Sequence, residues 1–240
     1  MNRLVAMGRR VLTCRAKHLI RTISSGSDSS QAGEGAVLKT LVGDFVCEDW
    51  VIDVGANNGV SFSNSLAFVR RGWHSILIEP APAVFRKLAA NHAHLKNVIC
   101  LQVACCENPG EADLYIGSDG EEGFLSTLCT SNNEWFDKAR TPQSVKVKTN
   151  TLTNILTNQK VPGRPGILLV DCEGMDYEAL LGLDFSRFRP TIIVTEEYEW
   201  EPAKHAAKYG LLIHANYSLF QKVGCNTIWL DRTAVRRRSH

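Results

Sequence analysis

The sequence predicts an α/β protein whose central sheet is mostly parallel and is covered by helices on both faces. Short, almost wholly apolar segments that fit strands alternate with segments of helical spacing along most of the 240 residues. Strands buried on both faces give such continuous apolar runs, and parallel strands need helical crossovers between them. With 44% hydrophobic residues, the chain is long enough for one sizeable domain with tails.

The first predicted elements alternate as this fold requires. Residues 36–46 have helical spacing and lead into an apolar strand at 50–54, which ends in the glycine turn GANNG. Residues 61–72 are expected to form a helix, and HSILIEP at 74–80 is a second short apolar strand. Residues 81–95 are helical, with a proline tolerated in the first turn.

The middle of the chain continues the alternation and interrupts it once. NVICLQVACC at 97–106 is expected to be a third strand. From 107 to 150 two alternating segments, EADLYIG and SVKVKTN, flank a polar stretch and indicate an inserted hairpin or lid. A short helix at 151–159, a fourth buried strand at 165–174 and its helix at 175–185 follow.

The C-terminal part adds a fifth strand at 189–198 and two further strand-like runs. These runs, GLLIHANYSLF at 210–220 and GCNTIWLDR at 224–232, have Gly224 between them. Two strands joined so tightly pair antiparallel. No internal repeat and no second domain are visible.

The net charge of the chain is close to zero, but both of its ends are basic. The net charge is +2, yet residues 1–27 hold six basic residues and no acid, and residues 232–240 hold four arginines and no acid. The span 28–231 therefore carries 17 basic against 25 acidic residues, a net charge of −8. We expect a basic arm with a Ser/Gly linker at 1–35, one domain at 36–232 and a basic tail at 233–240. An acidic domain argues against a nucleic-acid partner.

The basic arm bears on the location of the protein. Its arginines, spaced apolar residues and serine-rich end are typical of an organelle transit peptide. A basic helix or solvated tail of a cytoplasmic protein has the same composition. We expect a cytoplasmic protein, with the mitochondrial or plastid matrix as the alternative. No apolar run reaches the roughly 18–20 residues of a transmembrane helix.

The eight cysteines show neither a Cys-x-x-Cys pair nor the Cys/His spacing of a zinc site. Several lie in strand-like runs, where they are expected to be small buried hydrophobic residues in a reducing compartment.

The glycine turn is the main functional signal. In an open α/β sheet, ligands bind beyond the carboxyl ends of strands at the point where the strand order reverses. The first strand ends at Asp53, so Gly55 to Gly59 should lie there, with Gly59 letting the next helix approach the ligand. Glu79 ends the second strand, where an acidic residue accepts both ribose hydroxyls of an adenosine ligand. A tight turn that binds nothing is the alternative.

Two features favour S-adenosylmethionine over a dinucleotide as this ligand. A dinucleotide turn has the spacing G-x-G-x-x-G, whereas Gly55 and Gly59 have no glycine between them to admit a pyrophosphate. A carboxylate at Asp53 repels a phosphate but suits a cationic ligand. Asn57 adds amide donors and acceptors for the amino-acid end.

Several segments in this order and spacing resemble the FkbM-type S-adenosylmethionine-dependent methyltransferases. They are VIDVGANNGVSF, LIEP, LLVDCEGMDYEALLGLDF, RPTIIVTE and NTIWL, and the resemblance covers roughly residues 36–231. It implies a Rossmann-like class I methyltransferase fold with a seven-stranded sheet and an antiparallel last strand. It also implies methyl transfer, usually to a hydroxyl.

The resemblance assigns roles by position. Asp53, Gly55, Asn57 and Gly59 would line the methionine side, Glu79 would hold the ribose, and Asp171 and Glu173 would lie near the sulfonium and the acceptor. Leu169 stands where many members have a lysine and Thr153 where an aspartate is common, so the type of acceptor stays open.

Carboxylates at strand ends are the candidates for a general base: Asp171, Glu173, and one of Glu196 and Glu197, since neighbours on a strand face opposite ways. An alternative role for Asp171 is to order the loop before helix 175–185. Acids at two adjacent strand ends could also bind Mg²⁺. No neighbouring asparagine or second aspartate completes that set, so we predict no metal.

We therefore expect an O-methyltransferase acting on a small-molecule or glycan hydroxyl. The alternatives are an N-methyltransferase acting on a protein or amine, and a methyltransferase fold kept as a binding protein. A NAD(P)-dependent oxidoreductase is disfavoured by the missing middle glycine and by the lack of a Tyr-x-x-x-Lys motif. The oligomeric state does not follow from the sequence.

Overall fold

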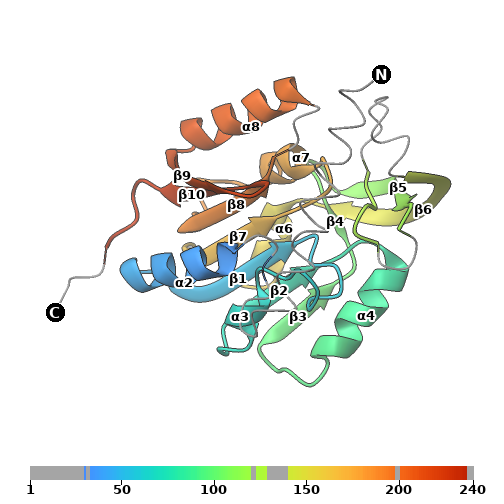
Figure 1. Cartoon of the computed structure of the whole chain (residues 1–240), viewed down its shortest axis with the longest axis horizontal. Helices are drawn as coiled ribbons and strands as arrows, with labels where there is room; N and C mark the ends of the chain where they lie inside the picture. The colour runs from blue at the N-terminus through green and yellow to red at the C-terminus, as the bar shows by residue number, and fades with distance from the viewer. Residues whose placement is uncertain (1–29, 31–32, 120–122, 129–139, 198–200, 237–240) are drawn as a thin grey trace.

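A seven-stranded sheet forms the centre of the computed structural model, which describes residues 30, 33–119, 123–128, 140–197 and 201–236 (Figure 1). In spatial order the strands are β3 (Val98–Leu101), β2 (His74–Ile78), β1 (Glu48–Val54), β7 (Pro165–Val170), β8 (Ile192–Glu196), β10 (Asn226–Asp231) and β9 (Tyr217–Val223). The strand that comes last along the chain, β10, is antiparallel to both of its neighbours, and the other pairs are parallel. The predicted fold class is confirmed.

Helices cover both faces of this sheet because successive strand residues point to opposite sides. On one face, Ile52 and Val54 of β1 pack with α6 (Leu152–Asn158), α7 (Asp176–Leu181) and α8 (Pro202–His214). On the other, Val51 packs with α2 (Glu34–Asp44), and Leu77 of β2 packs with α3 (Leu66–Val69) and α4 (Pro82–His92). Figure 1 shows α8 above the sheet and α2 and α4 below it.

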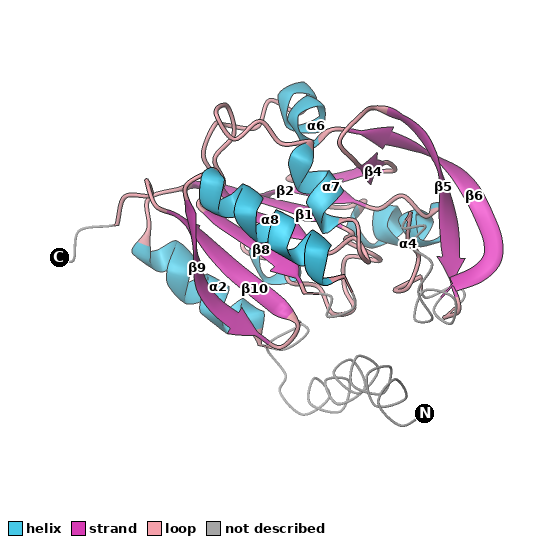
Figure 2. Cartoon of the chain, turned by 90° about the horizontal axis from the view of Figure 1, so that it is seen from above, coloured by secondary structure: helices cyan, strands magenta, loops and turns pink. Residues whose placement is uncertain are grey.

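The expected insert is a small sheet of its own. It contains β4 (Ala104–Cys105), β5 (Gly110–Gly117) and β6 (Arg140–Asn150), with β6 in the middle. β5 and β6 pair antiparallel, as the alternating segments predicted. Leu114 and Val147 pack against Ala81 and Val84 at the start of α4, so the insert stands beside the carboxyl edge of the main sheet (Figure 2).

The predicted helix 61–72 is wrong in length, because α3 spans only Leu66–Val69. The side chains of the serines that precede it form hydrogen bonds with other groups. The Ser63 hydroxyl accepts the N–H of Leu66, and the Ser65 hydroxyl donates to the Asp53 carboxylate. Side chains that bond locally in this way compete with helix formation.

Two further segments differ from the prediction. The run 97–106 is split: β3 stays in the main sheet, whereas β4 pairs with β6 of the insert. The start of the run 210–220 belongs to α8, and only Tyr217 onward is strand. A short apolar run does not by itself distinguish helix from strand, nor one sheet from another.

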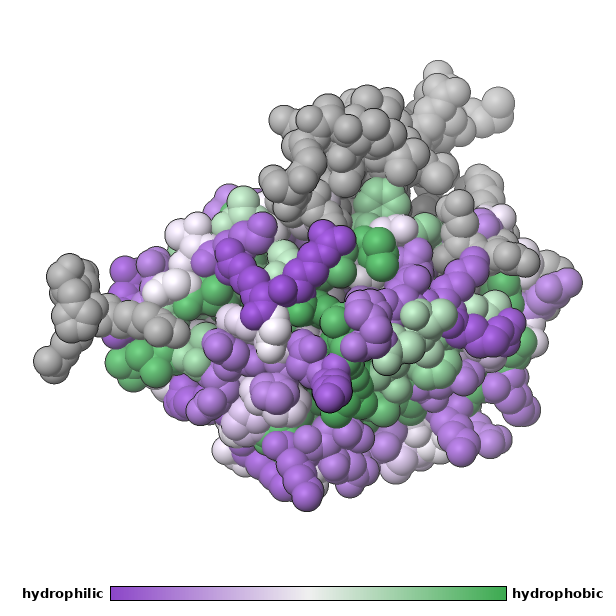
Figure 3. Space-filling view, turned by 90° about the horizontal axis from the view of Figure 1, so that it is seen from below, coloured by the Kyte–Doolittle hydropathy of each residue, from purple (hydrophilic) through white to green (hydrophobic). Residues whose placement is uncertain are grey.

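The ends of the described chain pack on the domain. α2 begins at Glu34, within the segment expected to be linker, and the N–H of Val46 donates to the carbonyl of Val235 over 2.8 Å, within the expected tail. The basic arm at 1–27 lies outside the described residues. Figure 3 shows hydrophilic side chains over most of one face, with smaller apolar areas between them. No helix among the described residues is long and apolar enough to span a membrane.

Candidate functional site

A cavity of about 1030 Å³, open to solvent, lies at the carboxyl ends of β1, β2, β7 and β8. The strand order reverses between β1 and β7, so this is the crevice where ligands bind in open α/β sheets. This space includes the open mouth of the crevice.

Gly55 brings the end of β1 against the loop after β7. Its φ is +82°, and a Cβ there would lie 1.8 Å from the backbone oxygen of Asp171. The N–H groups of Gly55 and Ala56 both donate to the carbonyl of Ile78 over 3.0 Å, which ties the turn to β2. Only glycine fits this position, because both the torsion and the space exclude a side chain.

Gly59 is not among the described residues that line the cavity. A Cβ at Gly59 would lie 2.3 Å from Nε2 of His92 and 2.7 Å from Cδ1 of Leu88, both in α4. The small residue thus lets α4 pack beneath the turn.

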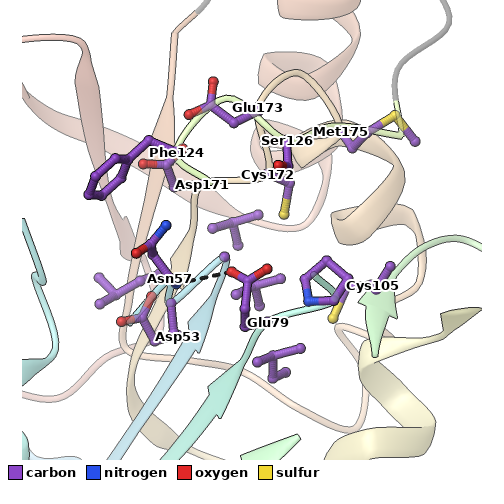
Figure 4. Close-up of a pocket in the computed structure, with 18 of the residues that line it drawn as sticks. Asp53, Asn57, Glu79, Cys105, Phe124, Ser126, Asp171, Cys172, Glu173 and Met175 are labelled. Atoms are coloured by element: carbon purple, nitrogen blue, oxygen red, sulfur yellow. Dashed lines mark hydrogen bonds between the residues drawn. The ribbon is translucent and has the colours of Figure 1, made fainter. Parts of the chain in front are cut away.

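Glu79 is held rigidly at the floor of the cavity. Its two carboxylate oxygens accept the N–H of Asn57 over 3.1 Å and the N–H of Ala81 over 2.8 Å (Figure 4). Burial raises the pKa of Glu79 to about 7, against these two hydrogen bonds and with a smaller contribution from the charge of Asp53. Glu79 lines the cavity and each of its oxygens has a second lone pair, which suits a pair of vicinal hydroxyls.

Asp53 is the second buried carboxylate of the cavity. Burial raises its pKa to about 6, and the Ser65 hydroxyl that donates to it acts in the opposite direction. A buried carboxylate with a single hydroxyl donor is stabilised by a cationic ligand that brings positive charge.

Three residues of the cavity wall hold the left-handed backbone conformation without being glycine: Asn57 (φ 50°), Phe62 (φ 56°) and Glu173 (φ 49°). Such torsions cost of order 1–3 kcal/mol and concentrate at functional sites. At Phe62 the turn aims an aromatic ring toward Phe124 of the insert, with ring centres 5.5 Å apart.

Asp171 and Glu173 line the far side of the cavity, and Glu196, which is not among the described lining residues, places its carboxylate beside theirs. One carboxylate oxygen from each lies within 4.8 Å of the others. Figure 4 shows Asp171, Glu173 and Phe124 together, opposite Asp53 and Glu79. Of the two strand-end glutamates, Glu196 joins this cluster, while the Glu197 carboxylate accepts from the Tyr209 hydroxyl and the Lys222 amine. Three such oxygens could also hold a divalent cation.

The insert supplies part of the wall, and the sequence did not indicate which of its residues would do so. Phe124, Ser126 and Thr127 line the cavity, and the Thr127 hydroxyl donates to the carbonyl of Glu173 over 2.7 Å. This bond joins the insert to the loop after β7. The polar stretch between the two predicted strands carries no motif, so no local signal could have identified these residues.

Asp176 is a further residue that the sequence analysis did not single out. Its carboxylate accepts the N–H of Cys172, and so performs the loop-ordering role considered for Asp171. Its place at the start of a helix directly after the acidic motif is the signal that could have pointed to it.

Comparison with known proteins identifies a family. The model of the methyltransferase FkbM domain matches residues 53–219. No curated protein matches the chain significantly.

Several solved structures match the chain at low identity. An FkbM methyltransferase from Methylobacillus flagellatus KT has 16% identity and a TM-score of 0.47, covering 76% of this chain and 43% of its own. An O-methyltransferase from Bacillus cereus in complex with SAH has 11% identity and a TM-score of 0.47, covering 91% and 90%. A precorrin-6y C5,15-methyltransferase from Geobacter metallireducens GS-15 has 11% identity and a TM-score of 0.42, covering 82% and 85%. The chain thus spans less than half the length of the first of these proteins.

Proposed function

Since the chain belongs to the FkbM methyltransferase family, with a Rossmann-like fold of the class I S-adenosylmethionine-dependent enzymes, we propose that it methylates a hydroxyl of a small molecule or glycan. The observation that carries this proposal is the pairing, across one cavity, of Glu79 and Asp53 with the carboxylate cluster of Asp171, Glu173 and Glu196. The side with Glu79 and Asp53 suits the methyl donor, and the side with the carboxylate cluster suits the acceptor.

The residues present fit S-adenosylmethionine. Glu79 is preorganised by two backbone donors to accept two ribose hydroxyls, and Asp53 and Asn57 stand where the cationic methionine portion would lie. Gly55 keeps the turn free of side chains between the two. When bound, S-adenosylmethionine supplies an electrophilic methyl group on a sulfonium.

The chain has two tasks in the transfer. The cavity walls hold the acceptor in line with the methyl group, and such positioning can supply about 7–11 kcal/mol in favourable cases. One carboxylate of the cluster takes the hydroxyl proton, an effect typically of about 10²–10⁴-fold. We assign this base to Asp171, Glu173 or Glu196, because their oxygens converge beside the cavity. The proposal needs no metal ion.

The cavity also restricts the acceptor. Asp171 and Glu173 line the cavity, with the Glu196 carboxylate close to both, and these negative charges repel acceptors that carry a carboxylate or phosphate. Phe62 and Phe124 offer apolar ring surface beside the same wall. Together they favour a neutral ring compound, either a phenol or a sugar, over an anion.

A screen with methyl-labelled S-adenosylmethionine tests the proposal. It compares neutral phenols and glycosides with amines, phosphates and carboxylates as acceptors. We expect label in a base-stable methyl ether of a neutral hydroxyl compound. Label in an amine would show that the chain is an N-methyltransferase and not an O-methyltransferase. Tight cofactor binding without transfer to any acceptor would indicate that the chain is a binding protein.

A further inference from the structure

A buried carboxylate joins the two loops that carry the acidic cluster. Asp176, the first residue of α7, is 2% exposed. Its Oδ1 accepts the N–H of Cys172 and its Oδ2 accepts the N–H of Glu196, each over 2.9 Å. Cys172 follows β7 and Glu196 ends β8, so one side chain fixes the spacing between two strand ends.

A buried lysine completes the connection from the helix on the same face. Nζ of Lys208, in α8, lies 3.6 Å from Oδ2 of Asp176, and both side chains are 3% exposed. The same Nζ donates to the carbonyl of Glu196. The backbone of Glu196 is thus held from both sides, through its N–H by Asp176 and through its carbonyl by Lys208.

Stability alone does not account for this pair. A buried ion pair can often be replaced by apolar residues without loss of stability, because desolvation offsets most of its attraction. Burial raises the pKa of Asp176 to about 6, Lys208 acts in the opposite direction, and Asp171 adds to the rise. Two buried charged side chains, whose desolvation is unfavourable, therefore lie where the loops of Asp171, Glu173 and Glu196 meet.

We propose that Asp176 and Lys208 form a bracket that positions the acidic cluster for methyl transfer. Neither residue lies among the described residues that line the main cavity, so both act through the backbone of Cys172 and Glu196. They are positioning residues for the proposed function, and the assignment of a role to them rests on that function. Misplacement of a catalytic group by about 1 Å can cost about 10²-fold in rate.

Two variants and one matched control test the bracket. Asp176→Asn keeps the shape but turns an N–H₂ toward one of the two backbone donors, and Lys208→Met removes the amine from a stem of similar length. Glu178→Gln is the control. It lies two residues further along α7 and loses the same charge, and its carboxylate pairs with Lys204 of α8 over 2.9 Å.

The first readout is hydrogen exchange of single backbone amides by NMR in the full chain. We expect at least one of the amides of Cys172 and Glu196, the one that faces the new N–H₂, to exchange at least about tenfold faster in Asp176→Asn, a loss of protection of about 1.4 kcal/mol. The amides of Val51 and Ile76 in β1 and β2 should be unchanged. The bracket is overturned if exchange accelerates equally at all amides in Asp176→Asn and Lys208→Met. It is also overturned if exchange does not accelerate at Cys172 and Glu196.

The second readout separates positioning from stability. At a temperature where all variants are folded, we expect kcat on the acceptor found in the screen to fall about 10²-fold in Asp176→Asn and in Lys208→Met. KM should change by less than about threefold. The double variant should be no slower than the slower single variant, because the two act as a unit. Normal kcat in both single variants contradicts the proposal.

A titration with S-adenosylmethionine separates this proposal from the function on which it rests. If the wild-type chain does not bind it, the proposed function fails, and the amide exchange still decides whether the bracket holds the two loops.

Discussion

Replacing Gly55 by alanine tests the packing between the glycine turn and the loop after β7. Gly55 has φ +82°, and an added Cβ would lie 1.8 Å from the backbone oxygen of Asp171. Gly72 is a matched control, because its φ is +85° and an added Cβ meets nothing within 4 Å. The two substitutions share the torsional cost, and only Gly55→Ala adds the overlap.

The expected magnitudes follow from these two terms. A non-glycine residue in the left-handed region costs about 1–2 kcal/mol. Overpacking costs typically about 1–3 kcal/mol, and the overlap at Gly55 is with backbone that cannot rotate away. We therefore expect Gly72→Ala to lower the free energy of unfolding by about 1–2 kcal/mol and Gly55→Ala by about 2–5 kcal/mol. For a chain of this size the difference corresponds to a Tm lower by several degrees, at about 2–4 °C per kcal/mol.

Thermal and urea unfolding of the two variants measure this difference. Gly55→Ala should also weaken S-adenosylmethionine binding at a temperature where it is folded, because the end of β1 must move away from β7. Gly72→Ala should bind normally. Equal destabilisation by both variants would refute the close contact between Gly55 and Asp171.

Three further predictions concern the two sides of the cavity. With a pKa of about 7, Glu79 must lose its proton to accept two hydroxyls, so S-adenosylmethionine should bind about tenfold more tightly at pH 8 than at pH 6 in calorimetry. Glu79→Gln should bind weakly and lose most of this dependence, and an unchanged pH dependence in that variant would contradict the assignment. Phe124→Ala should raise KM for a ring acceptor several-fold and leave the Kd of S-adenosylmethionine within about threefold, as checked by initial rates and calorimetry; the reverse pattern would place the ring on the donor side. EDTA should leave the transfer rate within about twofold. A loss of rate that Mg²⁺ restores would instead indicate that the carboxylates of Asp171, Glu173 and Glu196 bind a metal ion.

The elements that the sequence predicted well are those with local signals. The buried strand, the turn from Gly55 and the acidic end of the second strand occupy short, consecutive stretches of chain, and the apolar run, the glycines and the acidic residue together indicate one structure. The antiparallel pair around Gly224 is likewise set by a tight turn.

The remainder depends on contacts between distant parts of the chain. The length of α3 depends on Ser65 binding Asp53, and the split of β3 from β4 depends on pairing with β6. Gly59 is explained only by α4 packing beneath it. The wall formed by Phe124 arises from a segment that carries no recognisable pattern, and the bracket at Asp176 depends on contacts with β8 and α8.

Calorimetric titration of the full chain with S-adenosylmethionine tests the central claim most directly, with NAD⁺ as the control ligand. We expect one-to-one micromolar binding that is lost in Glu79→Ala and kept in Glu111→Ala, where the residue is exposed on β5. No binding by folded wild-type protein, or binding of NAD⁺ in its place, would contradict the account.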